Sequence, residues 1–286
     1  MNALKGAGRW WLCIAPMYLF TLVFVLGPVL YMVAVSFAQN EAGTGFRWAF
    51  TLENFSKMRD PIYLQCFRES FQLALSTTVL NALIGYPFGY FMGRLSAKGK
   101  RIMMFLIMVP FWTSSLIRLY GWLILLQAKG AVNNLLLALG IIDAPLKILY
   151  TYPAVLIGMV YGLLPFMILA VYTSVEKMDW TLVEASRDLG ASRAKAFFTV
   201  TLPMTLPGLM SGVILTFVPS MGLFFIADLL GGNKIVLVGS LIQDQMTRGS
   251  NQPFAAALAL VLAAMTTLML WGYRKLTGTS ELEGML

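Results

Sequence analysis

The chain has 286 residues, of which 58% are hydrophobic and only 12% are charged, and its formal net charge is +8. Soluble domains contain about 25% charged and about 45–50% apolar residues, so this composition excludes a soluble protein and indicates an integral membrane protein. The sequence has no histidine, which excludes metal sites and acid–base catalysis based on imidazole. The excess of basic residues is typical of membrane topology and gives no reason to expect nucleic acid as a partner.

Six long apolar runs are candidates for membrane-spanning helices. A spanning helix needs about 20 apolar residues, and suitable runs cover residues 10–38, 70–93, 102–126, 152–173, 206–227 and 254–272. The first run is much longer than the roughly 7–15 apolar residues of a signal peptide, so we expect it to remain as a helix. The sequence therefore predicts an all-α integral membrane fold with six transmembrane helices.

The orientation in the membrane follows from one short loop. In residues 94–101, RLSAKGKR, four of eight residues are basic. Short loops rich in Lys and Arg remain in the cytoplasm. With six spans, this rule places the N-terminus, the C-terminus and residues 181–203 in the cytoplasm.

Glycines and prolines in the spans predict a tightly packed bundle with bent helices. Glycines recur at intervals of four at Gly85, Gly89 and Gly93, at Gly158 and Gly162, and at Gly208 and Gly212. Such stripes let helices approach closely in a bilayer, where no hydrophobic effect drives their association. The prolines inside spans are Pro110, Pro165 and Pro219. Each removes a backbone hydrogen bond and favours a kink.

Residues 181–203, TLVEASRDLGASRAKAFFTVTLP, interrupt the apolar pattern with charges. Thr181 and Glu184 have the spacing of a capping box, which predicts a helix start. Gly190 suits the left-handed residue that ends a helix. Ser192 is expected to cap a second short helix that stops before Pro203.

The first of these two helices is predicted to be amphipathic. Its small, mostly apolar face consists of Leu182, Ala185, Ser186 and Leu189. Helices that lie on a membrane surface usually carry bulky apolar residues opposite many cations. Here the apolar face is small and the polar face has mixed charge, which favours docking into a protein groove.

The same stretch resembles the EAA motif of ABC importer permeases, written E-A-A, three residues, G, nine residues, I-x-L-P. The positions that correspond to the motif are Glu184, Ala185, Ser186, Gly190, Leu202 and Pro203, with serine in place of the second alanine. Val200 stands in place of the isoleucine. The resemblance implies a coupling helix that sits in a cleft of a separate cytoplasmic ATPase subunit.

The resemblance extends over most of the chain from about residue 50. Segments 109–121, 129–151, 162–179 and 219–232 are similar to permeases of spermidine/putrescine (polyamine) importers. This similarity implies a type I permease bundle in the bacterial inner membrane. It divides the chain into residues 1–69 with the first helix and a periplasmic loop, residues 70–273 with five helices, and a cytoplasmic tail at 274–286.

The resemblance also implies a working complex. Its members are this chain, a second homologous permease, two ATPase subunits and a periplasmic polyamine-binding protein. ATP and Mg²⁺ are expected on the ATPase subunits, and this chain is expected to bind no cofactor. In agreement, residues 93–100, GRLSAKGK, fail the phosphate-loop pattern in glycine spacing, and no catalytic motif is recognisable.

Five residues are candidates for the cargo pathway. Asp228 lies at the predicted end of an apolar span, where ionisable residues are functional candidates. Phe224 and Phe225 precede it by one turn and are expected to attract a cation by roughly 0.5–2 kcal/mol each. Tyr161 and Trp112 are further aromatic candidates.

Asp228 has an alternative role as the partner of Arg118. Arg118 is about 24 Å along its helix from Ile102, and Asp228 about 33 Å along its own from Leu206, at 1.5 Å per residue. A kink at Pro219 shortens the second distance. An intramembrane charge pair between Arg118 and Asp228 is therefore the competing hypothesis.

Two other functions remain open at this point. A self-sufficient secondary transporter is expected to contain inverted repeats, and no matching halves are recognisable. An ABC importer of another small solute, such as an opine, a phosphonate or another organic amine, shares parts of the same segments.

Overall fold

The computed structural model describes residues 14–41, 45–232, 234–249 and 251–277, and most of these residues are helical. The chain divides into two compact units. One unit contains Met1–Leu64 and Leu241–Thr267, and the other contains Gln65–Ser240 and Leu268–Leu286. The predicted all-α membrane fold is confirmed, whereas the predicted division at residues 69 and 273 stays a prediction.

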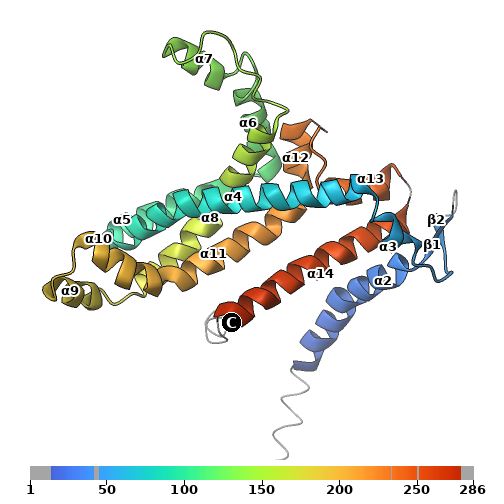
Figure 1. Ribbon diagram of the computed structural model, residues 1–286, viewed down its shortest axis with the longest axis horizontal. Coiled ribbons are helices and arrows are strands. Elements are labelled where there is room, and N and C mark those ends of the chain that lie inside the picture. Colours follow the sequence, from blue (N-terminus) through green and yellow to red (C-terminus); the bar gives the residue numbers. More distant parts are fainter. Residues whose placement is uncertain (1–13, 42–44, 233, 250, 278–286) are drawn as a thin grey trace, which may run out of the picture. The chain divides into compact units, whose positions relative to one another are not determined.

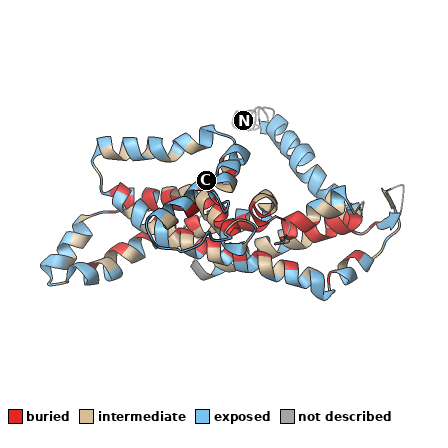
Figure 2. Cartoon of the chain, turned by 90° about the horizontal axis from the view of Figure 1, so that it is seen from above, coloured by how far each residue is buried: buried red, intermediate tan, exposed pale blue. Residues whose placement is uncertain are grey.

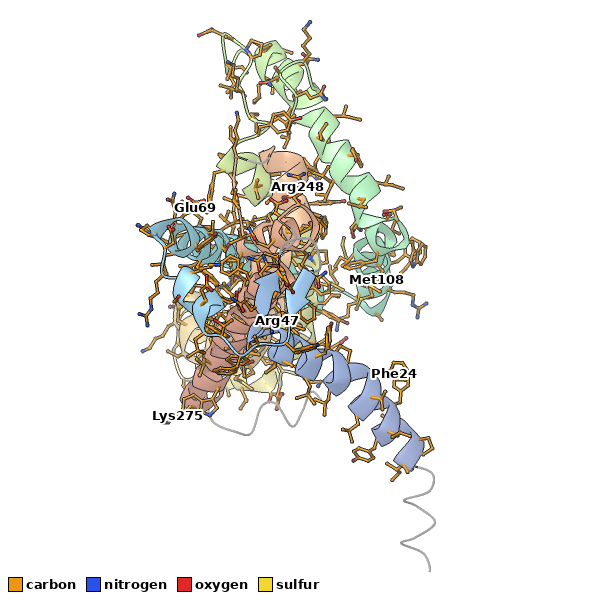
Figure 3. The ribbon with its side chains drawn as sticks, turned by 90° about the vertical axis from the view of Figure 1, so that its right-hand side faces the viewer. Phe24, Arg47, Glu69, Met108, Arg248 and Lys275 are labelled. Carbon is orange, nitrogen blue, oxygen red and sulfur yellow. The ribbon has the colours of Figure 1, made fainter. Side chains whose placement is uncertain are left out.

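The first unit begins with a helical segment, Ile14–Ser36. It contains the π-helical turn η1 (Leu22–Leu26) and α2 (Gly27–Ser36). Its side chains are largely exposed, as for Phe24, whose ring projects outward in Figure 3. A short antiparallel hairpin follows, formed by β1 (Gln39–Glu41) and β2 (Gly45–Arg47).

A buried asparagine connects the end of α2 to α3 (Glu53–Lys57). The Asn54 side-chain amide donates to the carbonyls of Ser36 at 3.0 Å and Ala38 at 2.9 Å. It thereby satisfies carbonyls that the end of a helix leaves without partners. The second segment of this unit, Leu241–Thr267, covers most of α13 (Val238–Thr247) and most of α14 (Gln252–Thr277).

Three long helices form the centre of the second unit (Figure 1). These are α4 (Pro61–Gly93), α8 (Tyr152–Glu176) and α11 (Leu202–Gly222). The predicted glycine stripes of α4 and α11 lie at their contacts with α8, whereas Gly158 and Gly162 of α8 lie against Ile226, in the short helix that follows α11. A Cβ placed on Gly85 would lie 2.6 Å from Met167 Cγ of α8, and one on Gly89 would lie 2.8 Å from Val171 Cβ. Residues buried by this packing are red in Figure 2.

The third predicted span is broken. It consists of α5 (Ala97–Met108), the 3₁₀ turn η2 (Val109–Trp112) and α6 (Ser115–Leu125), and its two halves are bent by 92°. Pro110 lies in the 3₁₀ turn, where its missing N–H removes a helical hydrogen bond. The next helix, α7 (Ala131–Ala138), follows α6 after a short connection, residues 126–130 (Figure 1).

The number of spans differs from six in the described part of the chain. Four helices are long and apolar enough to cross a membrane, or five if the bent pair is one span. The predicted span 70–93 lies within α4, but α4 is not among these helices. Buried polar residues, among them Thr77 and Asn81, lower its hydropathy. The count of six and the cytoplasmic termini therefore stay predictions.

The fifth predicted span, 206–227, is also placed differently. The helix runs without interruption from Arg193 to Gly222. After Leu223 the chain starts a separate helix, α12 (Phe224–Gly231). Pro219 precedes this break, and Leu223 N–H donates to its carbonyl at 3.0 Å. Residues 224–227 therefore belong to a second, short helix.

Substituting Gly208 tests the close contact between α11 and α8. A Cβ at this position would lie 2.6 Å from the carbonyl oxygen of Ala170 and would collide with Ser174. We expect Gly208→Ala to lower the unfolding free energy in detergent by about 1–3 kcal/mol through overpacking. Gly121→Ala is the matched control, because a Cβ on Gly121 meets nothing within 4 Å. Equal melting temperatures for the two variants would contradict the contact.

Candidate functional site

Residues 181–203 form two short helices and a ramp. They comprise α9 (Thr181–Asp188), α10 (Arg193–Ala196) and the π-helical turn η3 (Phe197–Thr201), which leads into α11. Figure 1 shows α9 and α10 at the end of α11 that is remote from α12. The predicted pair of helices is present, but its start and its end differ from the prediction.

The capping-box prediction is wrong. Thr181 is the first residue of α9, and its hydroxyl does not cap the helix. Instead, Asp179 Oδ1 accepts from the Thr181 N–H at 3.0 Å and from the Thr181 hydroxyl at 2.8 Å. These two hydrogen bonds lower the pKa of the Asp179 carboxyl. A carboxylate two residues before the helix thus satisfies the first amide, a turn that aspartate often forms.

The bend between α9 and α10 is as predicted. Gly190 has φ of 88°, a left-handed conformation that glycine adopts without steric cost. The N–H of Ala191 donates to the Ser186 carbonyl at 3.1 Å, as in helix ends of this kind. The Ser192 hydroxyl accepts from the Lys195 N–H at 3.2 Å, which confirms the second cap.

The second helix does not stop before Pro203. It continues through η3 into α11, and the N–H of Leu202 donates to the Phe197 carbonyl, five residues back. This wider turn lets the helix pass a proline, which cannot make the normal hydrogen bond. Leu202 and Pro203 therefore lie inside one continuous helix rather than at a joint.

The apolar face of α9 is open to solvent. Leu189 is 89% exposed and Leu182 is 46% exposed, and Ala185 is exposed as well. Val183 and Ser186 are partly buried instead. The predicted docking face is thus not covered by the described part of this chain.

A cavity of about 430 Å³ lies among α6, α8, α11 and α12. Its walls include four aromatic residues: Phe111, Tyr161, Phe166 and Phe225. The small side chains at Gly158 and Gly162 leave room on the α8 wall, and Pro219 lies on the α11 wall. Among the described residues that line it, Arg118 alone carries a charge.

Arg118 forms hydrogen bonds on both sides of the break in the third predicted span. Its guanidinium donates to the Pro110 carbonyl and, at 3.2 Å, to the Ser115 hydroxyl. It also lies 5.8 Å from the centre of the Phe111 ring and 6.0 Å from that of Tyr161. A cation in an apolar span needs such partners, since desolvation alone is costly. Arg118 therefore stabilises the bend at η2.

Asp228 has a different partner. Its Oδ1 accepts from the Ser240 hydroxyl at 2.8 Å, and among the described residues no ion pair joins it to Arg118. Arg118 is occupied instead by the carbonyl eight residues before it, exposed by the break in the span. The charge-pair alternative is therefore not formed in this structure.

The structure brings together only some of the predicted pathway residues. Tyr161 and Phe225 line the cavity with Arg118. Phe224 packs edge-on against Phe225 with ring centres 6.2 Å apart, but does not line the cavity. Trp112 is 72% exposed and contacts Phe105.

Two aromatic residues that line the cavity were not predicted from the sequence. Phe111 and Phe166 stack edge-on at 5.6 Å within the cavity wall. Each is adjacent to a proline, Pro110 or Pro165, that the sequence marks as a kink. An aromatic residue next to a proline that is predicted to kink a span is therefore the sequence signal that could have identified both residues.

Comparisons with known proteins give a consistent result. Residues 85–277 match the family described as binding-protein-dependent transport system inner membrane component. The chain is 42% identical over 265 residues to the spermidine/putrescine transport system permease protein PotB of Escherichia coli, covering 91% of this chain and 96% of that protein. It is 41% identical to PotB of Haemophilus influenzae, covering 91% of each chain.

A solved structure shares the fold. It is the bacterial alginate ABC transporter in complex with an alginate pentasaccharide-bound periplasmic protein. The TM-score is 0.74 at 17% identity, covering 97% of each chain.

Independent roles for Arg118 and Asp228 can be tested with a double-mutant cycle. We expect Arg118→Met to lower the unfolding free energy by about 1.5–3 kcal/mol, because a charged hydrogen bond is lost. The losses from Arg118→Met and Asp228→Asn should add to within about 0.5 kcal/mol, as for residues without a shared partner. The measurement is reversible unfolding in detergent micelles. A double variant more stable than Asp228→Asn alone would show that the two charges are paired.

Proposed function

Because the chain belongs to the family of binding-protein-dependent transport system inner membrane components, we propose that it forms half of the transmembrane pathway of an ATP-driven importer of polyamines. Similarity over nearly the whole length to two spermidine/putrescine permeases carries this proposal. The chain is an ABC transporter permease subunit of the inner membrane. The family leaves no support for a self-sufficient secondary transporter.

In the proposed mechanism α9 is the coupling helix. Its open apolar face, formed by Leu182, Ala185 and Leu189, inserts into a groove of a cytoplasmic ATPase subunit. Burying exposed leucines supplies the association energy, at about 25 cal/mol per Å² of apolar surface. Two ATPase subunits bind and hydrolyse ATP with Mg²⁺, and their closure moves α9.

The uninterrupted helix after α9 provides the mechanical connection. Arg193–Gly222 is one 30-residue helix. Its N-terminal end adjoins α9, and its C-terminal part reaches the aromatic cavity at Leu215 and Pro219. A displacement of α9 is therefore transmitted along a rigid element toward the cavity.

The remaining partners are a second homologous permease and a periplasmic polyamine-binding protein. The second permease supplies the other half of the pathway. The fold neighbour was solved with a substrate-bound periplasmic protein, and a polyamine-loaded protein has the corresponding role here. Its ligand enters the pathway when the pore faces outward.

The cavity constrains how a cationic cargo passes. Arg118 repels a polyamine, whereas the rings of Tyr161 and Phe225 attract it by roughly 0.5–2 kcal/mol each. Asp228 does not line the cavity, but its carboxylate lies on the adjacent α12 and supplies an attractive charge, since only Oδ1 accepts a side-chain hydrogen bond among the described residues. An opine, a phosphonate or another organic amine is the alternative cargo. Thermal-shift screening of the binding protein against polyamines distinguishes a polyamine importer from an importer of these other solutes.

The coupling role predicts a defect at Gly190. Proline cannot adopt the φ of 88° found there, and even alanine would be strained by about 1–2 kcal/mol. We expect Gly190→Pro to lower ATPase stimulation by loaded binding protein about tenfold or more, with Glu184→Lys acting in the same direction. Gly140→Pro is the matched control, since Gly140 also has a positive φ of 67° but follows α7.

The readouts of this experiment are co-purification of the ATPase subunit and its stimulated turnover. The Gly140 variant should keep the ATPase subunit bound. Normal stimulated turnover in both Gly190→Pro and Glu184→Lys would show that α9 does not couple ATP hydrolysis to transport.

The cargo role predicts an uptake defect at Asp228. We expect Asp228→Asn to reduce uptake at limiting spermidine about tenfold, the effect of losing roughly 1.4 kcal/mol of attraction, with normal yield of the assembled complex. Ser240→Ala is the matched control, because it removes the 2.8 Å hydrogen bond and keeps the charge. Full uptake by Asp228→Asn with normal assembly would remove Asp228 from the pathway.

A further inference from the structure

A second cavity lies where α4 ends against α9, α10 and η3. Its volume is about 350 Å³. Small-molecule sites commonly have volumes of about 300–1,000 Å³, so this cavity is large enough to bind a small molecule. All of its walls come from the second unit, and Tyr90 and Trp180 form part of them.

The cavity is basic. Arg94, Arg187 and Arg193 line it, against one carboxylate, that of Glu184. Arg94 stacks over the Trp180 ring at 5.2 Å and the Tyr90 ring at 5.8 Å. Among the described residues, the guanidiniums of Arg187 and Arg193 form no hydrogen bond or ion pair, although Glu184 is near. Two charged, fork-shaped donors are therefore available to a ligand.

The chemistry of these donors favours a phosphate. Guanidinium groups bind phosphate oxygens through paired, charge-assisted hydrogen bonds. Arg187 lies on α9 and Arg193 begins α10, so one anion bound by both bridges the bend at Gly190. A bound phosphate would thus hold α9 and α10 at a fixed angle.

The position of the cavity at the ends of long helices favours a lipid as the source of that phosphate. Trp180 lies four residues after the end of α8, and Arg193 starts the 30-residue helix, and both helices are long and apolar enough to span a membrane. Ends of spanning helices lie among lipid headgroups, where Trp and Tyr are enriched. Basic pockets between transmembrane helices on the cytoplasmic side bind anionic headgroups.

We propose that this cavity binds the phosphodiester headgroup of an anionic phospholipid, with Arg187 and Arg193 as the donors and Trp180 and Tyr90 against the glycerol. The proposal rests on the proposed function in taking α9 as the coupling helix on the cytoplasmic side. Lipid occupancy then stiffens the coupling helix and makes transport dependent on anionic lipid.

The test uses the whole importer with its partner subunits in nanodiscs of phosphatidylcholine with or without phosphatidylglycerol. Retained phosphatidylglycerol is counted by native mass spectrometry. The pocket pair is Arg187→Gln with Arg193→Gln. The matched pair, Lys98→Gln with Arg101→Gln, removes the same charge from exposed residues of helix α5, outside the cavity.

We expect retention to fall about 30-fold in the pocket pair, as for two lost arginine–headgroup contacts of about 1 kcal/mol each. The matched pair should change it less than about threefold, because Lys98 and Arg101 do not line the cavity. Phosphatidylglycerol should also raise the stimulated ATPase rate of the wild type and the matched pair, but not of the pocket pair. Equal retention by the two pairs overturns the proposal.

Two further outcomes would assign the arginines elsewhere. The first is binding of inorganic phosphate. A wild-type melting temperature that rises with inorganic phosphate in detergent, with no selective phosphatidylglycerol retention, identifies a soluble anion and overturns the lipid assignment. Loss of the ATPase subunits from the pocket pair, with lipid retention unchanged, identifies a protein carboxylate and also overturns it.

Failure of the proposed function has a separate signature. Spermidine uptake by the wild-type importer in proteoliposomes tests the cargo without reference to the cavity. Absent uptake together with selective lipid retention would contradict the cargo and leave the lipid site standing.

Discussion

The packing of Met167 between two glycines determines the arrangement of the second unit. This fully buried side chain of α8 lies against Gly85 of α4 on one side and Gly212 of α11 on the other, where added Cβ atoms would come within 2.6 Å and 2.5 Å of it. In a bilayer, lipid tails are as apolar as methionine, so helices associate through close van der Waals contact. Only glycine allows that contact here. The ends of α4 and α11, which carry the basic cavity and α9, are positioned by this contact.

Charged groups inside the apolar region are neutralised locally rather than by one another. Arg118 uses a carbonyl that the broken span exposes, a serine hydroxyl and two aromatic rings. Asp228 uses the hydroxyl of Ser240. Because the two charges have different partners, we propose that the carboxylate serves a cationic cargo, while the cation has a structural role at the bend.

The two faces of α9 separate two kinds of interaction. Its apolar residues, Leu182 and Leu189, face away from the described chain, whereas Arg187 faces the basic cavity with Arg193. The left-handed Gly190 sets the angle between the two short helices. In the proposed model, a partner protein on one face and an anionic headgroup on the other would act on the same bend, and the continuous helix from Arg193 to Gly222 would transmit its position toward the aromatic cavity.

Features that depend on neighbours along the chain were predictable from the sequence. The apolar runs, the left-handed Gly190, the Ser192 cap and the glycine stripes follow from residue type and spacing, and the motif at 184–203 indicated the family. Choices between competing partners were not predictable. Asp179 rather than Glu184 satisfies the start of α9, and a π-helical turn carries the helix through Pro203. Arg118 pairs with the Pro110 carbonyl because the span breaks by 92° there. A hydrogen-bonding group takes the partner that folding brings within reach, and only the tertiary structure determines which partner that is.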